Sequence, residues 1–331
     1  MISIIKRILV CVVVILMAIG LMSCLKKKKV QKIELEDEIT VMEDPNEPKE
    51  DMIPRPDLQP KLKEAQEKYK EAVAWLYIPE SVDLPVMLCS KDSGENDGKN
   101  RYYRHAEDGS YRLCGSVYTF PKSVIDSREK LSRNLVLMGH HIEGKNELLL
   151  GPLEKFYEFS FTKKHPYVFL AIPGENLIFE IFAVYVTEVP ARKYNKVGFC
   201  YYFSVDPANE TPDNPTKGGD GSLPAQFVAA TDKSWVQIVS EEAKKRSLYN
   251  YEGISIDKDD KIITLTTCTY IFGKTGSKNC LSIEFVIQGK LLTPERKLRD
   301  EARVKKNQNP KWPNLPEPKR SFKYEAEDGE K

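Results

Sequence analysis

The feature that most constrains the fold is a series of short runs rich in β-branched and aromatic residues, separated by turn signals. Such runs predict strands, because branched and aromatic side chains fit a pleated, half-buried surface. The predicted strands are 75–79, 84–88, 115–120, 134–140, 167–171, 176–186, 262–268 and 281–292. Helical spacing is found near 62–75, 148–156 and 231–246. This arrangement predicts a mainly β domain, a barrel or a sandwich, with helical insertions.

Two of the predicted strands end on chemically reactive residues. The run 262–268 ends on Cys268, and the run 134–140 ends on His140. A cysteine and a histidine are the minimal set for thiol nucleophilic catalysis, because the thiolate attacks and the imidazole handles the proton. His141 follows directly, but neighbouring strand residues face opposite sides, so the two histidines are not expected to share a metal. The sequence therefore predicts Cys268 and His140 as a catalytic pair.

Charge and cysteine usage exclude other classes of protein. The 331 residues include 50 basic and 49 acidic side chains, for a formal net charge of +1. No overall field attracts nucleic acid, so no nucleic-acid partner is expected. The seven cysteines are an odd number and form no CxxC pair, so neither a zinc site nor a complete disulfide framework is expected.

The N-terminus predicts the compartment. Lys6 and Arg7 precede an apolar run at 8–25, and four lysines follow at 26–29. The run is about as long as a bilayer-spanning helix, so it is interpreted as an export signal, an uncleaved transmembrane anchor, or both. A looser match to a lipoprotein box makes Cys24 an alternative lipidation site. Either anchor, a transmembrane helix or a lipid on Cys24, places the rest of the chain outside the cytoplasm and tethered to the cell membrane.

Composition divides the chain into four segments. Residues 1–25 are the signal or anchor, and residues 26–60 are charged and interrupted by prolines. The second segment has too few apolar side chains to fold alone, so it is predicted to be a disordered linker. Residues 61–293 form the predicted β domain. Residues 294–331 are again charged and proline-rich and are predicted to be a disordered tail.

Several segments, in order along the chain, resemble the class B sortases, which are membrane-anchored cysteine transpeptidases. The most specific is Thr-Leu-Thr-Thr-Cys at 264–268, which is similar to the nucleophile motif of that family. The other segments that carry the resemblance are 74–79, 84–87, 102–105, 114–118, 137–140, 164–167, 179–185 and 246–249. The resemblance covers most of the predicted β domain.

The resemblance implies a fold and an activity. The fold would be a sortase-like eight-stranded β-barrel, and no organic cofactor would be needed. Cys268 would be the nucleophile and His140 its acid–base partner. The enzyme would cut the C-terminal sorting signal of an exported protein and hold the product as a thioester. It would then pass the acyl group to an amine on the cell wall or on a surface protein.

One position departs from the family. An arginine that stabilises the oxyanion is expected at the start of the last strand, where this chain has Glu284. A carboxylate repels developing negative charge and donates no hydrogen bond unless it is protonated. Lys278 is the candidate to supply oxyanion support instead, although an ammonium lacks the planar fork of a guanidinium. Cys280 could also pair with Cys268 in an oxidising exterior and block the site.

Two functions therefore remain open. The first is a sortase B-like cysteine transpeptidase. The second is a sortase-like domain that has lost efficient turnover and binds sorting peptides or surface proteins, and Glu284 is the residue that favours it. A papain-like hydrolase is disfavoured, because in that family the cysteine precedes the histidine in the chain.

Overall fold

The computed structural model describes residues 48–88, 101–119, 123–142, 148–188, 234–271 and 283–312. The predicted anchor, the lipidation candidate Cys24, and both Lys278 and Cys280 lie outside these residues. Among the described residues, no helix is both long enough and apolar enough to cross a membrane.

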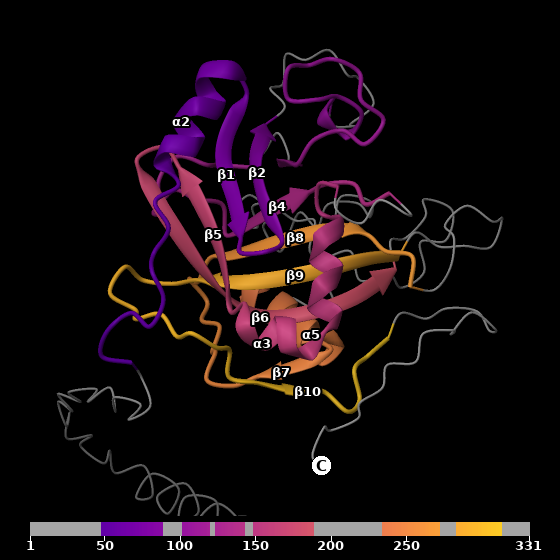
Figure 1. The fold of residues 1–331 in the computed structure, drawn as a ribbon. Coiled ribbons are helices and arrows are strands. Elements are labelled where there is room, and N and C mark those ends of the chain that lie inside the picture. The colour runs from indigo at the N-terminus through magenta and orange to yellow at the C-terminus, as the bar shows by residue number, and fades with distance from the viewer. Residues whose placement is uncertain are drawn as a thin grey trace, which may run out of the picture. The chain divides into compact units, whose positions relative to one another are not determined.

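Eight strands close into a barrel in the order β1-β2-β3-β4-β8-β9-β6-β5 (Figure 1). The predicted mainly β fold with a closed eight-stranded barrel is thus confirmed. The pairs β2–β3 and β4–β8 are parallel, and the other pairs are antiparallel. The strands are β1 (Ala72–Ile78), β2 (Val82–Leu88), β3 (Tyr118–Thr119), β4 (Asn134–Met138), β5 (Tyr167–Ile172), β6 (Glu175–Glu188), β8 (Ile262–Cys268) and β9 (Ile283–Leu291).

Alternation of side chains along the strands fills the barrel. In β1 every second residue is buried, from Ala72 to Ile78. Leu265 of β8 and Phe285 of β9 both belong to the main core cluster. Because successive strand residues face opposite sides, Thr266 lies on the outer face. The apolar side chains at alternate positions therefore decide which residues point out of the barrel.

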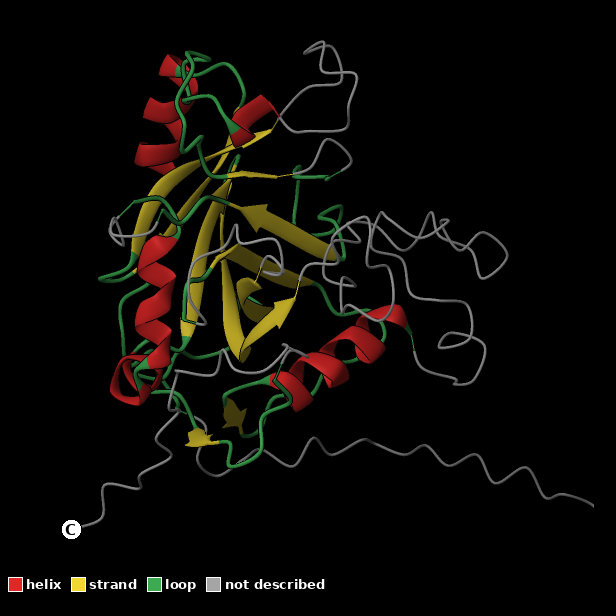
Figure 2. Ribbon diagram, turned by 90° about the vertical axis from the view of Figure 1, so that its right-hand side faces the viewer, coloured by secondary structure: helices red, strands yellow, loops and turns green. Residues whose placement is uncertain are grey.

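Helices lie around the outside of the barrel strands (Figure 2). They are α2 (Gln59–Lys68), α3 (Phe159–Lys164) and α5 (Trp235–Arg246), with the short 3₁₀ helices η1 (Arg101–Tyr103) and η2 (Gly151–Tyr157). Helix α5 starts with a capping box in which Ser234 and Gln237 exchange hydrogen bonds. Its buried face packs against Tyr185 and Val286 on the outer face of the barrel.

The first predicted helix is too long. Helical spacing suggested 62–75, but α2 ends at Lys68 and β1 begins at Ala72. The amide of Tyr69 still donates to the carbonyl of Ala65, and the chain then becomes extended. Pairing of β1 with both β2 and β5 outweighs the local helical pattern of this segment.

The segment after β9 differs from its predicted disorder. Residues Val304–Lys306 form β10, which pairs with β7 (Tyr249–Tyr251) in a second, two-stranded sheet. Asn307 donates from its side chain to the carbonyl of Ser247, at 2.7 Å. Leu298 is fully buried and packs in the cluster that contains Leu58 and Tyr167. The charged composition of this segment did not predict an ordered structure, because the contacts that order it are mostly made by the backbone and by single apolar side chains.

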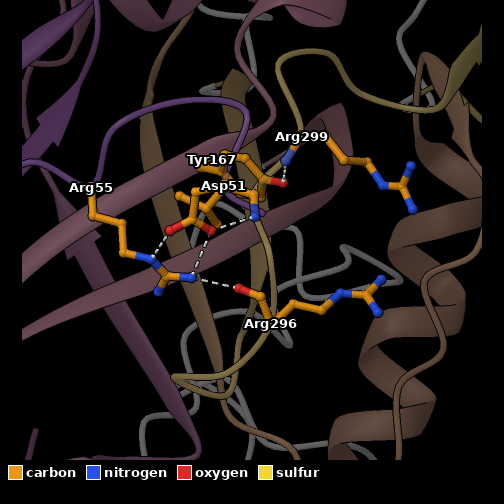
Figure 3. A network of polar contacts seen from close by, with 6 residues as sticks. Asp51, Arg55, Tyr167, Arg296 and Arg299 are labelled. Atoms are coloured by element: carbon orange, nitrogen blue, oxygen red, sulfur yellow. Dashed lines mark hydrogen bonds and ion pairs between the residues drawn. The ribbon is translucent and has the colours of Figure 1, made fainter. Parts of the chain in front are cut away.

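Residues 51–55, from the predicted linker, bind the same C-terminal segment (Figure 3). The Asp51 carboxylate accepts hydrogen bonds from Arg55 Nε at 2.6 Å and from the amide of Leu298 at 2.9 Å. Arg55 also donates to the carbonyl oxygen of Arg296 at 2.6 Å. Residues 51–55, near the start of the described chain, are thus joined to residues 296–298, which follow β9.

Candidate active site

The pairing of β4 with β8 brings together the two strand ends that lead to the predicted catalytic residues. The strands are parallel, and Met138 lies opposite Thr266. His140 and Cys268 each follow two residues later. Neighbouring strands are about 4.8 Å apart, so the backbones at the ends of β4 and β8 are neighbours. The amide of Gly139 donates to the carbonyl of Thr266 at 3.4 Å, which extends the contact beyond the end of β4.

A side-chain bond holds the two strand ends together. Thr267 Oγ1 donates to the carbonyl oxygen of Gly139 at 2.7 Å, and Thr267 is almost fully buried. A buried hydrogen bond of this kind contributes about 1 kcal/mol and costs more when one partner is left alone. The residue next to the cysteine therefore binds the residue next to the histidine.

Cys268 is the last residue of β8 and lies on the outer face of the barrel. It is half-buried, and it forms no disulfide within the described residues. Burial raises the pKa of the Cys268 thiol to about 11, with a further contribution from the carboxylate of Glu284. Arg104 acts in the opposite direction. At neutral pH the thiol is therefore protonated and needs a base before it can attack.

Glu284 lies directly opposite Cys268 in the antiparallel pair β8–β9. Residues opposite one another have their Cβ atoms about 5 Å apart and on the same face. Glu284 is only 6% exposed and accepts a hydrogen bond from Thr266 Oγ1. It is thus a buried carboxylate beside the sulfur, not a solvated charge at the edge of the strand.

Tyr103 positions the ring of His140. The two ring centroids are 4.3 Å apart, and His140 Nε2 lies 3.0 Å from the carbonyl oxygen of Tyr103. A carbonyl only accepts, so Nε2 carries the proton and donates, and Nδ1 of the neutral ring is the basic nitrogen. Burial lowers the pKa of His140, and the charge of Arg104 lowers it further. The half-buried ring is therefore kept neutral and able to accept a proton.

The segment 101–119 holds Tyr103 in place. The amide of Ser116 donates to the carbonyl of Tyr102 at 2.9 Å, and the Tyr102 hydroxyl donates to Glu71 at 2.7 Å. Gly115 has a φ of +60°, and a Cβ atom there would lie 2.2 Å from the Tyr102 carbonyl oxygen. Only glycine allows this close approach of two backbone segments.

Arg104 was not among the predicted site residues. Its guanidinium lies over the Tyr103 ring, 4.6 Å from the centroid, and donates to the carbonyl of Leu113 at 2.5 Å. The only sequence signal was its place inside the segment 102–105 that resembles the sortases. Nothing local in the sequence places that segment against the end of β4.

A second group of polar side chains surrounds the backbone of Cys268. His141, which is 2% exposed, has Nδ1 3.1 Å from the Cys268 carbonyl oxygen and 3.5 Å from Glu154 Oε1. Glu154 Oε1 also accepts from Thr269 Oγ1 at 2.5 Å, and the Tyr270 hydroxyl donates to the His141 carbonyl at 3.1 Å. Both neighbours of His141 Nδ1 are acceptors, so this nitrogen carries a proton. The group joins η2 to the ends of β4 and β8.

Of the remaining predictions, Lys278 and Cys280 fall within 272–282, outside the described residues. The structure therefore gives no position for the lysine or for a disulfide to Cys268. Within the described ranges, no group of three or more His, Cys, Asp or Glu side chains is arranged to hold a metal ion.

No protein-family model and no curated protein matches the sequence. Solved structures of sortase B do match the fold. A crystal structure of a sortase B complex has a TM-score of 0.49 and 18% identity, over 72% of this chain and 87% of that chain. The Staphylococcus aureus sortase B–substrate complex has a TM-score of 0.48 and 18% identity, over 71% and 86%. Sortase B from Listeria monocytogenes has a TM-score of 0.46 and 21% identity, over 69% and 99%. The chain resembles these structures at low identity, and the chemistry of its site has to be argued from its own residues.

Proposed function

We propose that the protein is a sortase B-like cysteine transpeptidase, with Cys268 as nucleophile and His140 as general acid and base. The observation that supports the proposal is the register of the parallel strands β4 and β8, in which Met138 is paired with Thr266, two residues before His140 and Cys268 respectively. The resemblance of 264–268 to the sortase nucleophile motif supports the same assignment.

The proposed reaction is an acyl transfer in two halves. The sulfur of Cys268 attacks a peptide carbonyl carbon, and a C–S bond forms as the C–N bond breaks. The departing amine takes the proton that His140 removed from the thiol. In the second half an acceptor amine attacks the thioester, its nitrogen loses a proton to His140, and the C–S bond breaks. The thiol then recovers that proton, so the enzyme is unchanged at the end.

The electrostatics of the site define the task of His140. The raised pKa of the Cys268 thiol means that a proton has to be removed before attack. The lowered pKa of His140 keeps its ring neutral, so Nδ1 can accept that proton at neutral pH. The protonated His140 then acts as the acid that protonates the leaving amine, the step of peptide-bond cleavage that most needs an acid.

The direct test is a search for the acyl-enzyme. The full-length protein in detergent is incubated with sorting-signal peptides and with an amine acceptor, and Cys268 is examined by mass spectrometry. We expect a peptide adduct on Cys268 that is released as the amine conjugate. Cys268→Ala should form no adduct, and His140→Gln should form it about 10²–10⁴ times more slowly, as is typical when an acid–base group is removed. An unmodified wild-type cysteine at every peptide tested would contradict the proposal.

A binding module is the second candidate, and Glu284 is the observation that favours it. A buried carboxylate beside the sulfur disfavours both the thiolate and an oxyanion. In that case the same peptides would bind with a measurable Kd, and Cys268→Ala would leave the Kd unchanged. Binding without an adduct would support this function over the transferase.

We further propose that the chain is exported and tethered to the cell membrane by residues 1–25, with the barrel outside the cytoplasm. Its partners would be exported proteins with a C-terminal sorting signal and an amine acceptor on the cell wall or on a surface protein. Support comes from the apolar run at 8–25 with basic residues on both sides. Fractionation with membranes, combined with cleavage of the barrel by protease added to wall-stripped cells, tests the location. Loss of a lipid adduct in Cys24→Ala separates lipidation from a transmembrane anchor.

A further inference from the structure

We propose that Arg104 supplies the positive charge that faces the reacting sulfur and the developing oxyanion, in place of an arginine on β9. This inference rests on the proposed transferase function and deepens it. The proposed cation thus comes from the segment between β2 and β3, which is far in sequence from β9, the strand that contains Glu284.

Two contacts fix the guanidinium of Arg104. It lies 4.6 Å from the centroid of the Tyr103 ring, and its NH1 donates to the carbonyl oxygen of Leu113 at 2.5 Å. The backbone is fixed too, because the amide of Arg112 donates to the Arg104 carbonyl at 2.9 Å. A guanidinium has five N–H donors, and the bond to Leu113 uses one of them. Among the described residues, the guanidinium therefore keeps donors that could bind an anion.

Tyr103 connects this guanidinium to the catalytic pair. The same ring that lies under Arg104 is 4.3 Å from the ring of His140, and the carbonyl oxygen of Tyr103 is 3.0 Å from His140 Nε2. His140 in turn follows β4 at the end where Met138 is paired with Thr266, two residues before Cys268. Tyr103 is thus in contact with both the guanidinium of Arg104 and the ring of His140.

The electrostatics of the pair agree with this position. Arg104 lowers the pKa of the Cys268 thiol and also lowers the pKa of His140. A positive charge lowers both values only when it lies near both groups, since it favours the thiolate and disfavours the imidazolium. Glu284 raises the pKa of the same thiol. One anion and one cation thus act in opposite directions on the Cys268 thiol, and the cation comes from the segment 101–119.

Arginine suits the proposed role chemically. The tetrahedral intermediate carries negative charge on the former carbonyl oxygen, and a fixed donor with a positive charge stabilises it. Removing one such donor typically slows the reaction by about 10²–10³. Glu284 would oppose the same charge, so a cation is needed to offset it.

The test uses a readout that does not depend on finding a substrate. The rate of alkylation of Cys268 by iodoacetamide, which is uncharged, is measured against pH on the full-length protein by mass spectrometry of the peptide that contains Cys268. We expect Arg104→Gln to raise the apparent pKa of the thiol and slow alkylation at pH 8 by about threefold to tenfold, because the rate follows the thiolate fraction. Arg104→Lys should keep most of the wild-type profile. NMR titration of His140 should show its pKa rising in the same Gln variant.

Two matched variants separate charge from loop structure and from the alternative lysine. Arg112→Gln removes an arginine of the same segment that binds Glu107 and the Gly115 carbonyl, and we expect no shift of the alkylation profile. Lys278→Ala should also leave the profile in place. Should Arg104→Gln fail to fold by circular dichroism, Arg104→Met, whose unbranched stem can still pack on Tyr103, replaces it.

Three outcomes would overturn the assignment: an unchanged profile in the Gln or Met variant, an equal shift in Arg112→Gln, or a shift in Lys278→Ala alone. Each can occur whether or not the wild-type protein forms an acyl adduct, so it is distinct from failure of the transferase proposal. When the adduct does form, its rate in Arg104→Gln should fall by about 10²–10³, with a smaller fall in Arg104→Lys.

Discussion

Glu284 lies directly opposite Cys268 across the antiparallel pair β8–β9. A carboxylate that is 6% exposed is thus on the same face as the sulfur that the sequence predicts to be the nucleophile. The carboxylate of Glu284 disfavours the thiolate form of Cys268, so attack by the sulfur needs a nearby base to remove the proton and a cation to offset the negative charge.

Replacing Glu284 by glutamine should activate the thiol. The carboxylate raises the pKa of Cys268, so its removal should lower that pKa by about one unit and speed alkylation at pH 8 up to about tenfold. Glutamine keeps an oxygen that can accept from Thr266 Oγ1, so the fold should be little affected. The pH profile of alkylation by iodoacetamide measures the change. Glu129→Gln, which removes an exposed carboxylate, is the control and should leave the profile unchanged.

Replacing Glu154 by alanine should loosen the backbone at Cys268. Thr269 and His141 would both lose an acceptor at nearly full burial, which typically costs about 1–3 kcal/mol in the free energy of unfolding. A double-mutant cycle in urea with Thr269→Val should show coupling of about 0.5–3 kcal/mol. The control cycle pairs Glu154→Ala with Thr162→Val, whose hydroxyl binds the Phe156 carbonyl. The control cycle should be additive. Additive effects in the cycle of Glu154 with Thr269 as well would contradict the contact between these two side chains.

Replacing Gly115 by alanine should disturb both stability and the site. The new Cβ would meet the Tyr102 carbonyl at 2.2 Å, so the segment that holds Tyr103 against His140 must shift. Gly174→Ala is the matched control, because Gly174 also has positive φ but has no atom within 4 Å of the added Cβ. We expect the control to cost about 1 kcal/mol from φ alone and Gly115→Ala to cost more, with a changed NMR signal of the His140 ring. Equal unfolding midpoints in urea would refute this.

The Asp51 contact should depend on pH in a defined direction. Hydrogen bonding to Arg55 lowers the pKa of Asp51 from 3.8 to about 2. A carboxylate with a depressed pKa stabilises the folded state above its unfolded pKa, and this contribution is lost as the pH falls through the folded value. Protection of the Leu298 amide, which donates to Asp51, should therefore be constant above about pH 4 and fall between about pH 4 and pH 2.

The measurement is hydrogen exchange at Leu298, expressed as a protection factor to remove the intrinsic effect of pH. Asp51→Asn should lower protection at pH 7 and abolish the dependence below pH 4. Asp126→Asn, which breaks an exposed pair with Lys130, is the control and should change neither. A variant at Asp51 that kept the wild-type curve would mean that the Leu298 amide is held by other contacts.

The local sequence pattern was sufficient to predict secondary structure where that structure depends on neighbouring residues. The runs of β-branched and aromatic residues at 75–79 and 262–268 predicted strands, and the structure contains β1 and β8 there, because such side chains fit a pleated, buried surface. The same reasoning misjudged 62–75, where α2 stops at Lys68 and pairing of β1 with two strands prevails. It also missed β10, whose residues 304–306 carry two lysines and pair mainly through the backbone.

Neighbouring residues in the sequence were enough to predict the short strands and to show that two of them lead to His140 and Cys268. The folded chain was needed to show that those strands are parallel and paired, that Glu284 is buried opposite Cys268, and that Arg104 lowers the pKa of both His140 and Cys268. These features depend on strand pairing, which joins segments more than a hundred residues apart. The pKa of each reactive group then depends on the charges and the burial that this pairing creates, and no local pattern encodes them.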